Sequence, residues 1–294
     1  MPQGRLNKKV VISGSTGFIG TALSTFLESN GYEVVRLRRH HFNTQNGQLA
    51  NLLSGSSVVI NLAGAPIAAR KWTARYKKEI RDSRIQTTKM LVETMRAMPL
   101  KPELFISTSA VGIYDRYEVH DEFSTNYAGN FLGTVCKQWE AAACQVQRWK
   151  DVRLCVVRLG VVLGNEGGAF PRMLAPFKWG MGAPLGEGYQ VFPFIHLNDL
   201  LSAFWYLICR VDSRGIFNMV APQMISNLEI TKVLQQRIHR SLLPAVPASV
   251  LKVLMGEGAS MLLEGQKVVP RRLQDTGFHF QFPTFDDVLD DLLY

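Results

Sequence analysis

The stretch VVISGSTGFIG, residues 10–20, constrains the fold of this 294-residue chain more than any other feature. An apolar run rich in β-branched residues ends at Gly14, and Gly17 and Gly20 follow at three-residue spacing as a helical pattern begins. Glycines let the backbone approach a pyrophosphate, and the helix N-terminus offers it unpaired N–H groups and a positive dipole end. The strand–turn–helix context therefore favours a dinucleotide-binding site over a plain tight turn.

Similar apolar runs alternate with helical patterns along the chain. Strands are predicted at residues 9–13, 33–37, 57–63, 103–109 and 153–160. Helices are predicted between them at 17–29, 73–98 and 130–149, and later at 198–210 and 227–239. The strand runs lack polar alternation, which is typical of strands covered on both faces. This order predicts an α/β fold with a doubly wound parallel Rossmann sheet.

The sequence changes character near residue 164. Segment 164–194 is rich in glycine, proline and aromatic residues, and it holds too many large apolar side chains to stay solvated. We expect it to form an ordered lid or pocket wall. The predicted division is a dinucleotide-binding domain over 1–164, with some later segments completing its sheet, and a smaller substrate-binding region over 165–294.

The composition narrows the classes of function. No apolar run approaches the roughly 18 residues that cross a bilayer, and the N-terminus lacks a secretory signal pattern. The four cysteines show no C-x-x-C spacing, so we expect a reduced, cytoplasmic protein without a metal site. The net charge of +9 is spread along the chain, which predicts a solvated surface that favours anionic ligands, with no nucleic-acid or membrane partner.

The residues after the second predicted strand indicate which dinucleotide binds. A protein that binds NAD usually carries an acid there, which holds the ribose 2′-hydroxyl. This chain has Arg38 and Arg39 in that place and no acid. Guanidinium groups match a 2′-phosphate bidentately, so the sequence predicts NADP(H) as the cofactor. The alternative is that both arginines are ordinary surface residues.

Three positions farther along belong to the same prediction. Ala63 and Gly64, after the third predicted strand, are small enough to let a cofactor ribose lie against the backbone. Arg84 falls on the inward apolar stripe of the helix over 73–98, and a charge there needs a partner. A salt bridge to Glu79 or Asp82 and a contact to a cofactor or substrate phosphate are equally open on spacing alone.

With these residues placed, the chain resembles the extended or atypical short-chain dehydrogenase/reductases. More narrowly, it resembles an epimerase-like family described as NADP-dependent oxidoreductases, which carries its own short C-terminal domain, here residues 245–294. The resemblance covers nearly the whole chain and rests on the segments STGFIG, NLAGAPI, KKEIRDSR, STSAVGIY, CKQWEAAA, VVRLGVVLG, PFIHLNDL, LLEGQKVVPRRL and GFHFQFP. It implies a Rossmann domain that binds NADP(H), with a pocket for a small-molecule substrate over the carboxyl ends of the strands.

The resemblance also assigns cofactor contacts residue by residue. It implies that the turn from Gly14 to Gly20 holds the pyrophosphate and that Arg38 and Arg39 hold the 2′-phosphate. It implies that Val162 lies near the nicotinamide end. Besides the arginine pair, the positions so assigned are Gly14, Thr16, Gly17, Phe18, Ile19, Gly20, Leu62, Ala63, Gly64, Glu79, Arg84 and Val162.

The catalytic residues that the resemblance implies are absent from their expected positions. Reductases and epimerases of this superfamily use a Ser or Thr, a Tyr and a Lys, and the tyrosine passes the proton as the hydride moves. Aligned on Tyr114 and Glu140, these positions fall at Ala110, Leu132 and Cys136. The sequence therefore leaves the proton donor unassigned.

Three interpretations follow. In the first, the reaction uses a substitute: Ser109, Tyr114, or Lys137 after a shift of one residue. Neighbouring residues on a helix differ by about 100°, however, which turns Lys137 away from position 136. In the second, the protein binds NADPH as a sensor or scaffold without turnover. In the third, His196 and Asp199 act as acid–base groups; the structural alternative is that Asn198 or Asp199 caps a helix and that His196 is hydrogen-bonded beside it.

Overall fold

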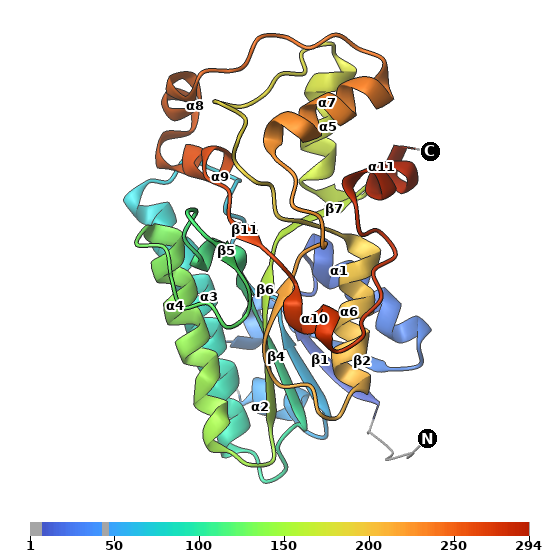
Figure 1. The fold of residues 1–294 in the computed structure, drawn as a ribbon. Coiled ribbons are helices and arrows are strands. Elements are labelled where there is room, and N and C mark those ends of the chain that lie inside the picture. Colours follow the sequence, from blue (N-terminus) through green and yellow to red (C-terminus); the bar gives the residue numbers. More distant parts are fainter. Residues whose placement is uncertain (1–7, 43–46, 294) are drawn as a thin grey trace.

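The computed structural model describes residues 8–42 and 47–293. At its centre lies a six-stranded sheet in which all neighbouring strands are parallel, in the order β10–β6–β4–β3–β1–β2 (Figure 1). Its strands are β1 Lys9–Ser13, β2 Glu33–Arg36, β3 Val58–Asn61, β4 Leu104–Ala110, β6 Arg153–Leu159 and β10 Gly215–Met219. The predicted doubly wound parallel sheet is confirmed.

Helices cover both faces of this sheet. The layers are α1 Phe18–Ser29 and α6 Leu197–Cys209 on one face, and α2 Gln48–Leu53, α3 Ala74–Ala97 and α4 Phe131–Ala143 on the other. Because successive side chains of a strand point to opposite faces, Ile12 packs with Leu23 and Phe204 under the first layer. Val11, its neighbour, packs with Phe105 under the second layer.

A smaller lobe is built mainly from residues after β6. Its elements are the strands β7 Val161–Gly164, β8 Gly167–Gly168 and β9 Phe194–His196, and the helices α5 Phe170–Lys178, α7 Asn227–Ile238 and α11 Phe285–Leu293. Phe170, Phe194 and Phe285 are fully buried in a core of its own. The helices α8 Ala248–Met255 and α9 Ser260–Leu263, joined by the 3₁₀ turn Gly256–Ala259, extend this lobe over α3 and α4 (Figure 1).

Short elements complete the described chain. These are the strand pair β5 Val119–His120 and β11 Lys267–Val268, helix α10 Arg271–Asp275, and the 3₁₀ turns Arg39–Phe42, Val111–Ile113 and Cys144–Arg148. No helix within residues 8–42 and 47–293 is long and apolar enough to cross a membrane. No cluster of three or more His, Cys, Asp or Glu side chains in the same ranges could hold a metal ion.

Local sequence signals set most of the element ends. Gly31 follows α1 with φ 79°, a left-handed conformation that suits glycine. Thr73 caps α3 by accepting the N–H of Tyr76, and α3 ends just before Pro99. The helix predicted over 130–149 ends as an α-helix at residue 143, because the chain tightens into a 3₁₀ turn that brings Val146 into the core.

Replacing Gly20 by alanine should destabilise the fold, whereas the same change at Gly17 should not. A Cβ at Gly20 would lie 2.2 Å from the carbonyl oxygen of Gly14, but a Cβ at Gly17 would lie 3.4 Å from that oxygen. We expect Gly20→Ala to lower the free energy of unfolding by about 2 kcal/mol and Gly17→Ala to change it by less than about 0.5 kcal/mol. Urea denaturation followed by circular dichroism measures both, and equal effects would contradict this account of the turn.

Candidate dinucleotide and substrate site

A crevice forms where the sheet changes its winding direction. β2 lies on one side of β1 and β3 on the other, so the connections from these strands leave in opposite directions. In open α/β sheets, ligands bind at the carboxyl ends of the strands at such a point. Gly14, with φ 69°, lies so close to the chain after β3 that a Cβ would be 2.6 Å from the carbonyl carbon of Leu62 and 2.9 Å from the nitrogen of Ala63. The glycine turn and the end of β3 therefore share one crevice.

The N-terminus of α1 opens into this crevice without a side-chain cap. Gly17 occupies the N-cap position, the first turn of α1 carries no acidic residue, and Thr16 and Gly17 are exposed. The other long helices α3, α4, α6 and α7 start with side-chain caps from Thr73, Asn130, His196 and Ser226. The Phe18 ring packs into the space left by Gly164, Gly167 and Gly168, so this side chain is in contact with the smaller lobe. The first amides of α1 thus have no side-chain acceptor, which suits an anionic ligand.

A buried hydrogen-bond network fixes the floor of the crevice. Ser13 Oγ donates to Asn61 Oδ1 at 2.6 Å, and Asn61 Nδ2 donates to Thr88 Oγ1 at 2.8 Å. The indole of Trp139 donates to the same Thr88 oxygen at 2.9 Å. The network joins β1, β3, α3 and α4. The predicted strand 57–63 ends at Asn61 because the N–H of Ala63 bends back to Asn61 Oδ1, 3.3 Å away.

The arginine pair lies at one end of the crevice. Arg38 and Arg39 follow β2 and are exposed, and their side chains make no hydrogen bond or ion pair within residues 8–42 and 47–293. Ser15 Oγ, in the glycine turn, donates to the Leu37 carbonyl at 3.2 Å, which holds the end of β2 beside the turn. Arg36 differs from its neighbours, because Glu28 binds it bidentately at 2.5 and 2.7 Å. The two unpaired cations therefore remain available to an anion.

Arg84 makes no salt bridge to Glu79 or Asp82. Its Nη1 donates to the carbonyls of Ala65, at 3.1 Å, and Ile80, at 2.9 Å. Asp82 pairs instead with Lys78 at 2.6 Å and with Arg81 at 3.0 Å. The salt-bridge alternative is therefore wrong.

The guanidinium of Arg84 is held at the edge of the crevice. It lies 5.3 Å from the centre of the Trp139 ring and so close to Gly64 that a Cβ there would be 2.9 Å from Arg84 Cζ. Burial lowers the pKa of Arg84, although the group stays charged at neutral pH. No carboxylate within the described ranges pairs with this cation.

Two other predicted contacts lie in different surroundings. Glu79 is exposed on α3 and makes no hydrogen bond or ion pair within the described part of the chain. Val162 is buried in β7, where it pairs with Ile195 of β9. These two cofactor contacts stay predictions.

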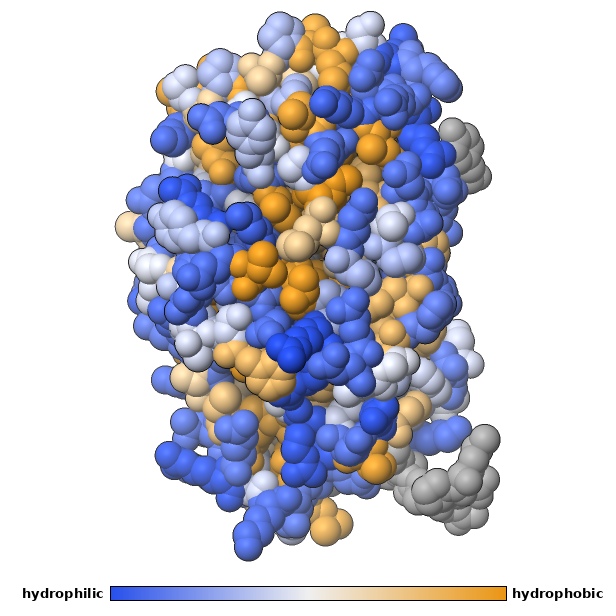
Figure 2. All heavy atoms as spheres, in the orientation of Figure 1, coloured by the Kyte–Doolittle hydropathy of each residue, from blue (hydrophilic) through white to orange (hydrophobic). Residues whose placement is uncertain are grey.

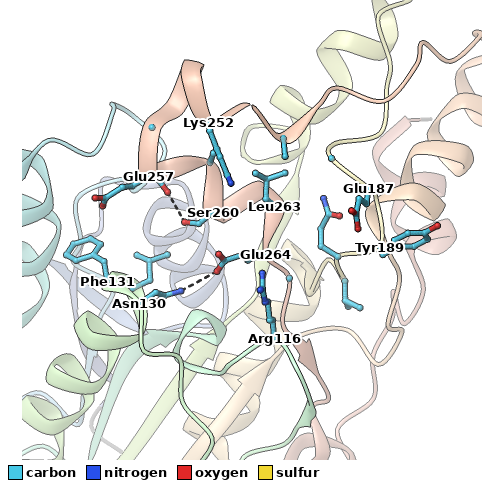
Figure 3. Close-up of a pocket in the computed structure, with 18 of the residues that line it drawn as sticks. Arg116, Asn130, Phe131, Glu187, Tyr189, Lys252, Glu257, Ser260, Leu263 and Glu264 are labelled. Atoms are coloured by element: carbon cyan, nitrogen blue, oxygen red, sulfur yellow. Dashed lines mark hydrogen bonds between the residues drawn. The ribbon is translucent and has the colours of Figure 1, made fainter. Parts of the chain in front are cut away.

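A cavity of about 910 Å³ opens between the Rossmann domain and the C-terminal segment (Figure 3). Its walls come from Trp72 before α3, the start of α4, the loop over 186–191, and residues 248–267. Leu132, the position where the superfamily has its tyrosine, is part of the wall. The loop over 186–191 belongs to the segment 164–194 that was expected to form a pocket wall. The contribution of Trp72 was missed, because it depends on contact between segments nearly 200 residues apart: the Trp72 indole lies against Gly258.

The cavity holds charges of both signs. Arg116, Lys252 and Lys267 line it and make no ion pair within the described residues. Glu257 is neutralised by Lys77 of α3, 2.6 Å away. Glu264 accepts a long hydrogen bond from Asn130 Nδ2, at 3.5 Å, and Figure 3 shows Glu264 between Asn130 and Arg116. The pocket can therefore bind an anionic group and offers a carboxyl group beside the start of α4.

The expected catalytic positions hold no usable acid. Leu132 is apolar, and burial raises the pKa of the Cys136 thiol to about 11, so the thiol is neutral at physiological pH. The charge of Arg84 opposes this rise, which puts a cation near the position where the superfamily has its lysine. Ser109 is buried beside Cys136, and its hydroxyl has no well-formed hydrogen bond within the described residues.

Tyr114 is held in a buried network outside the cavity. Arg158 Nη1 donates to its hydroxyl at 2.6 Å, and the hydroxyl donates to the Asp121 carbonyl at 2.9 Å or to Asn218 Oδ1 at 3.0 Å. Glu140 binds the rest of the Arg158 guanidinium at 2.8 Å through both oxygens. Burial raises the pKa of Tyr114 to about 12, so it is a poor proton donor.

Lys137 points away from the cavity, as the helical geometry predicts. It is exposed, and its ammonium lies 5.3 Å from the centre of the Tyr127 ring. Neither Lys137 nor Tyr114 lines the pocket. The structure therefore does not bring the three proposed substitutes together.

His196 and Asp199 have structural roles. The N-cap of α6 is His196 itself, whose Nδ1 accepts the N–H of Asn198 at 3.2 Å, so the expected cap at Asn198 or Asp199 is wrong by two or three residues. The Asp199 carboxylate accepts the N–H groups of Gln281 at 2.8 Å and Phe282 at 3.0 Å. Both groups tie the C-terminal segment to α6, and neither lines the cavity.

The parallel sheet, the uncapped glycine turn and the crevice define a Rossmann-type dinucleotide-binding protein. Residues 10–219 match the family model described as the NAD dependent epimerase/dehydratase family, and the chain belongs to that family. Residues 246–292 match a second model, described as a domain of unknown function (DUF1731). The resemblance predicted from sequence is confirmed.

Known relatives extend over almost the whole chain. Epimerase family protein SDR39U1 from Mus musculus is 37% identical over 293 residues, covering 97% of this chain and 99% of the relative. The chloroplastic SDR39U1 homologue from Arabidopsis thaliana is 35% identical, covering 95% of this chain and 85% of the relative. The crystal structure of human SDR39U1 (isoform 2) with NADPH superposes with a TM-score of 0.88 at 33% identity, covering 97% of this chain and 98% of the human one.

Tyr114→Phe should destabilise the protein, because it removes the oxygen that accepts from Arg158 and leaves part of a buried guanidinium without a partner. We expect the free energy of unfolding to fall by about 1 to 3 kcal/mol in denaturant titrations. Tyr127→Phe is the matched control, since the Tyr127 hydroxyl makes no hydrogen bond within the described residues, and it should cost less than about 0.5 kcal/mol. Equal losses in both variants would count against the structural role of the Tyr114 hydroxyl.

Proposed function

We propose that this protein binds NADPH in the crevice between β1 and β3 and acts as an oxidoreductase on a small molecule held in the cavity over α4. The observation that carries this proposal is the unpaired pair Arg38 and Arg39, held beside the glycine turn at the end of β2. Two guanidinium groups there match the 2′-phosphate that distinguishes NADPH from NADH. The human relative solved with NADPH supports the same cofactor.

The residues along the crevice fit this cofactor. The uncapped amides of α1 and the exposed turn at Thr16 and Gly17 suit the pyrophosphate. Phe18 and Ile19 would contribute through their backbone, because both side chains pack against the core. Leu62 and Ala63 form the opposite wall of the crevice.

NADPH, when bound, supplies a hydride from its nicotinamide ring. The chain contributes a cation and a carboxylate near α4. Arg84 sets its charge near Cys136, where it would take over the part that lysine plays toward the cofactor ribose. Glu264, held by Asn130 two residues before Leu132, would accept a hydrogen bond from the substrate and position it for the hydride.

A cytoplasmic location and a small-molecule substrate complete the proposal. All four cysteines, Cys136, Cys144, Cys155 and Cys209, are free, which supports a reducing compartment such as the cytoplasm. The volume of the cavity, about 910 Å³, supports a small molecule rather than a nucleic acid as the substrate.

A second candidate function is NADPH binding without turnover. It is favoured by one observation: Ala110, Leu132 and Cys136 leave the superfamily's three catalytic positions without a usable acid. In this case the cavity would serve a signalling ligand or partner, and the cofactor would report the redox state of the cell.

Removing the arginine pair should weaken the binding of NADPH and leave the binding of NADH unchanged. We expect Arg38→Ala with Arg39→Ala to raise the Kd for NADPH by about 10- to 100-fold, the value of one or two lost charge-assisted hydrogen bonds. Isothermal titration calorimetry measures both nucleotides. Arg36→Ala is the matched control, because Glu28 already binds Arg36, and it should leave the Kd unchanged.

The cofactor proposal fails on either of two outcomes. One is the absence of any heat with NADPH. The other is a clear preference of the unmodified protein for NADH.

Turnover should depend on Glu264 and be independent of Lys137. We expect a screen of carbonyl compounds and nucleotide sugars, followed by NADPH absorbance, to find a substrate whose rate falls by about 100-fold in Glu264→Gln, because the carboxylate that positions the substrate is lost. Lys137→Ala changes an exposed side chain that does not line the cavity, and this variant should retain the rate. Tight NADPH binding with no turnover across the screen would instead establish the sensor function.

A further inference from the structure

The end of the smaller lobe farthest from the sheet carries a surface built from three separate segments. The chain after α5 and the chain after α7 are joined by backbone hydrogen bonds, from Leu243 N–H to the Gly182 carbonyl and from Val246 N–H to the Pro184 carbonyl, both at 2.8 Å. Helix α8 follows directly. In Figure 1, α5, α7 and α8 all lie in the upper part of the view. We name this the α5–α8 surface and define its apolar residues as Trp179, Met181, Leu243, Val250, Val253 and Leu254.

These apolar side chains are exposed. Trp179 is 79% exposed and Val253 is 77% exposed, although both are large enough to gain from burial. Within α8 only Leu251 is buried, so this eight-residue helix turns Val250, Val253 and Leu254 to solvent. Figure 2 shows hydrophobic residues among hydrophilic ones at this end of the molecule. Single exposed hydrophobic residues are common, but a group gathered at one end indicates a contact surface.

The charged residues within these segments are all of one sign, and the next acid along the chain, Glu257, is paired with Lys77. The three segments lie within residues 171–184 and 239–256, which contain no aspartate or glutamate. Their cations are Arg172, Lys178, Arg240 and Lys252, which are exposed and make no ion pair within residues 8–42 and 47–293. An acid-free surface that combines exposed tryptophan, leucine and valine with unpaired cations is complementary to an anionic, apolar partner.

We propose that the α5–α8 surface docks the protein on an anionic lipid bilayer. Tryptophan and aliphatic residues enter the boundary between headgroups and acyl chains, while lysine and arginine side chains stay with the lipid phosphates. Each cation near an anionic membrane strengthens binding by about fivefold. The charge pattern was read from the sequence as a solvated surface with no membrane partner, because the three segments come together only in the fold.

Two other occupants fit less well. A second copy of the chain, meeting this surface face to face, would bring like charges together, which is costly. A nucleic acid would attract the cations, but exposed valine, leucine and methionine offer nothing to phosphates or to stacked bases. A bilayer satisfies both the apolar and the cationic groups.

The surface also adjoins the cavity. Ala248 and Lys252 of α8 line the pocket, while Val253 and Leu254 of the same helix face outward. A bilayer bound here would therefore lie next to the cavity wall. This inference does not depend on the cofactor, so it can fail while the proposed function stands.

The test is co-sedimentation of the full chain with vesicles. The vesicles contain phosphatidylcholine with phosphatidylserine at about one part in three, and phosphatidylcholine alone serves as the neutral comparison. We expect binding only to the anionic vesicles, weaker by at least about tenfold in Trp179→Ala with Leu254→Ala. We expect it to be weaker by about 25-fold in Lys178→Gln with Arg240→Gln. The fluorescence of Trp179 should shift to shorter wavelength on binding, and Trp179→Phe should abolish the shift.

Control variants carry the same changes at the other end of the molecule. Leu100→Ala removes a leucine that is 80% exposed just before β4, and Arg96→Gln with Lys150→Gln removes two exposed cations from the same end. All should bind like the unmodified protein. Absence of binding to anionic vesicles, or equal losses in test and control variants, would overturn the proposal. A third outcome would also overturn it: the protein does not bind vesicles, but it self-associates in sedimentation equilibrium, and Trp179→Ala abolishes the self-association.

Discussion

The buried ion pair between Arg158 and Glu140 is the interaction that fixes α4 and the C-terminal segment to the sheet. A fully buried guanidinium costs several kcal/mol unless it is paired with a carboxylate and hydrogen-bonded, so its partners must hold their places. Glu140 supplies two of these partners from α4, and the Tyr114 hydroxyl supplies the third. Asn218, bonded to Tyr114, donates onward to the Val269 carbonyl, and Glu122 accepts its N–H. The start of α4, which forms one wall of the cavity, is thereby held in a fixed position.

Local sequence patterns predicted the sheet, the glycine turn and most helix ends, because each depends on residues close together in the chain. Gly31 and Thr73, for example, end and begin helices through their own backbone preferences. A pocket wall over 164–194 was expected, but the part of the cavity that needs Trp72 beside Gly258 could not be predicted from local patterns. The same holds for His196, whose capping role was missed because Asp199 is occupied by amides more than 80 residues away. The helix over 130–149 was predicted too long for a related reason: core packing at residue 146 overrode local propensity.

The crevice and the cavity differ in how closely they follow the superfamily. In the crevice, the glycine turn, the end of β3 and the arginine pair lie together, and every feature suits a phosphorylated dinucleotide. Of the positions for tyrosine and lysine, the first holds an apolar side chain, Leu132, that lines the cavity, and the second holds the buried, neutral thiol of Cys136, which does not line it. A cation is nevertheless present near Cys136, the lysine position: it is Arg84, which belongs to α3 rather than to α4. The superfamily places its catalytic tyrosine and lysine on one helix. Here the corresponding helix is α4, and the charged groups proposed to contact cofactor and substrate are Arg84 of α3 and Glu264 of the C-terminal segment.

The order of the elements along the chain has a consequence for biosynthesis. β10 at Gly215–Met219 is the last strand of the sheet, Val269 accepts from Asn218 on that strand, and Phe285 completes the core of the smaller lobe. These residues leave the ribosome late. Until they emerge, β6 is an unpaired edge strand and Arg158 cannot be fully buried. The N-terminal half is therefore incompletely folded, and it can bind chaperones or aggregate. A premature stop within the final thirty or so residues should therefore be as damaging to cellular abundance as a lesion in the glycine turn.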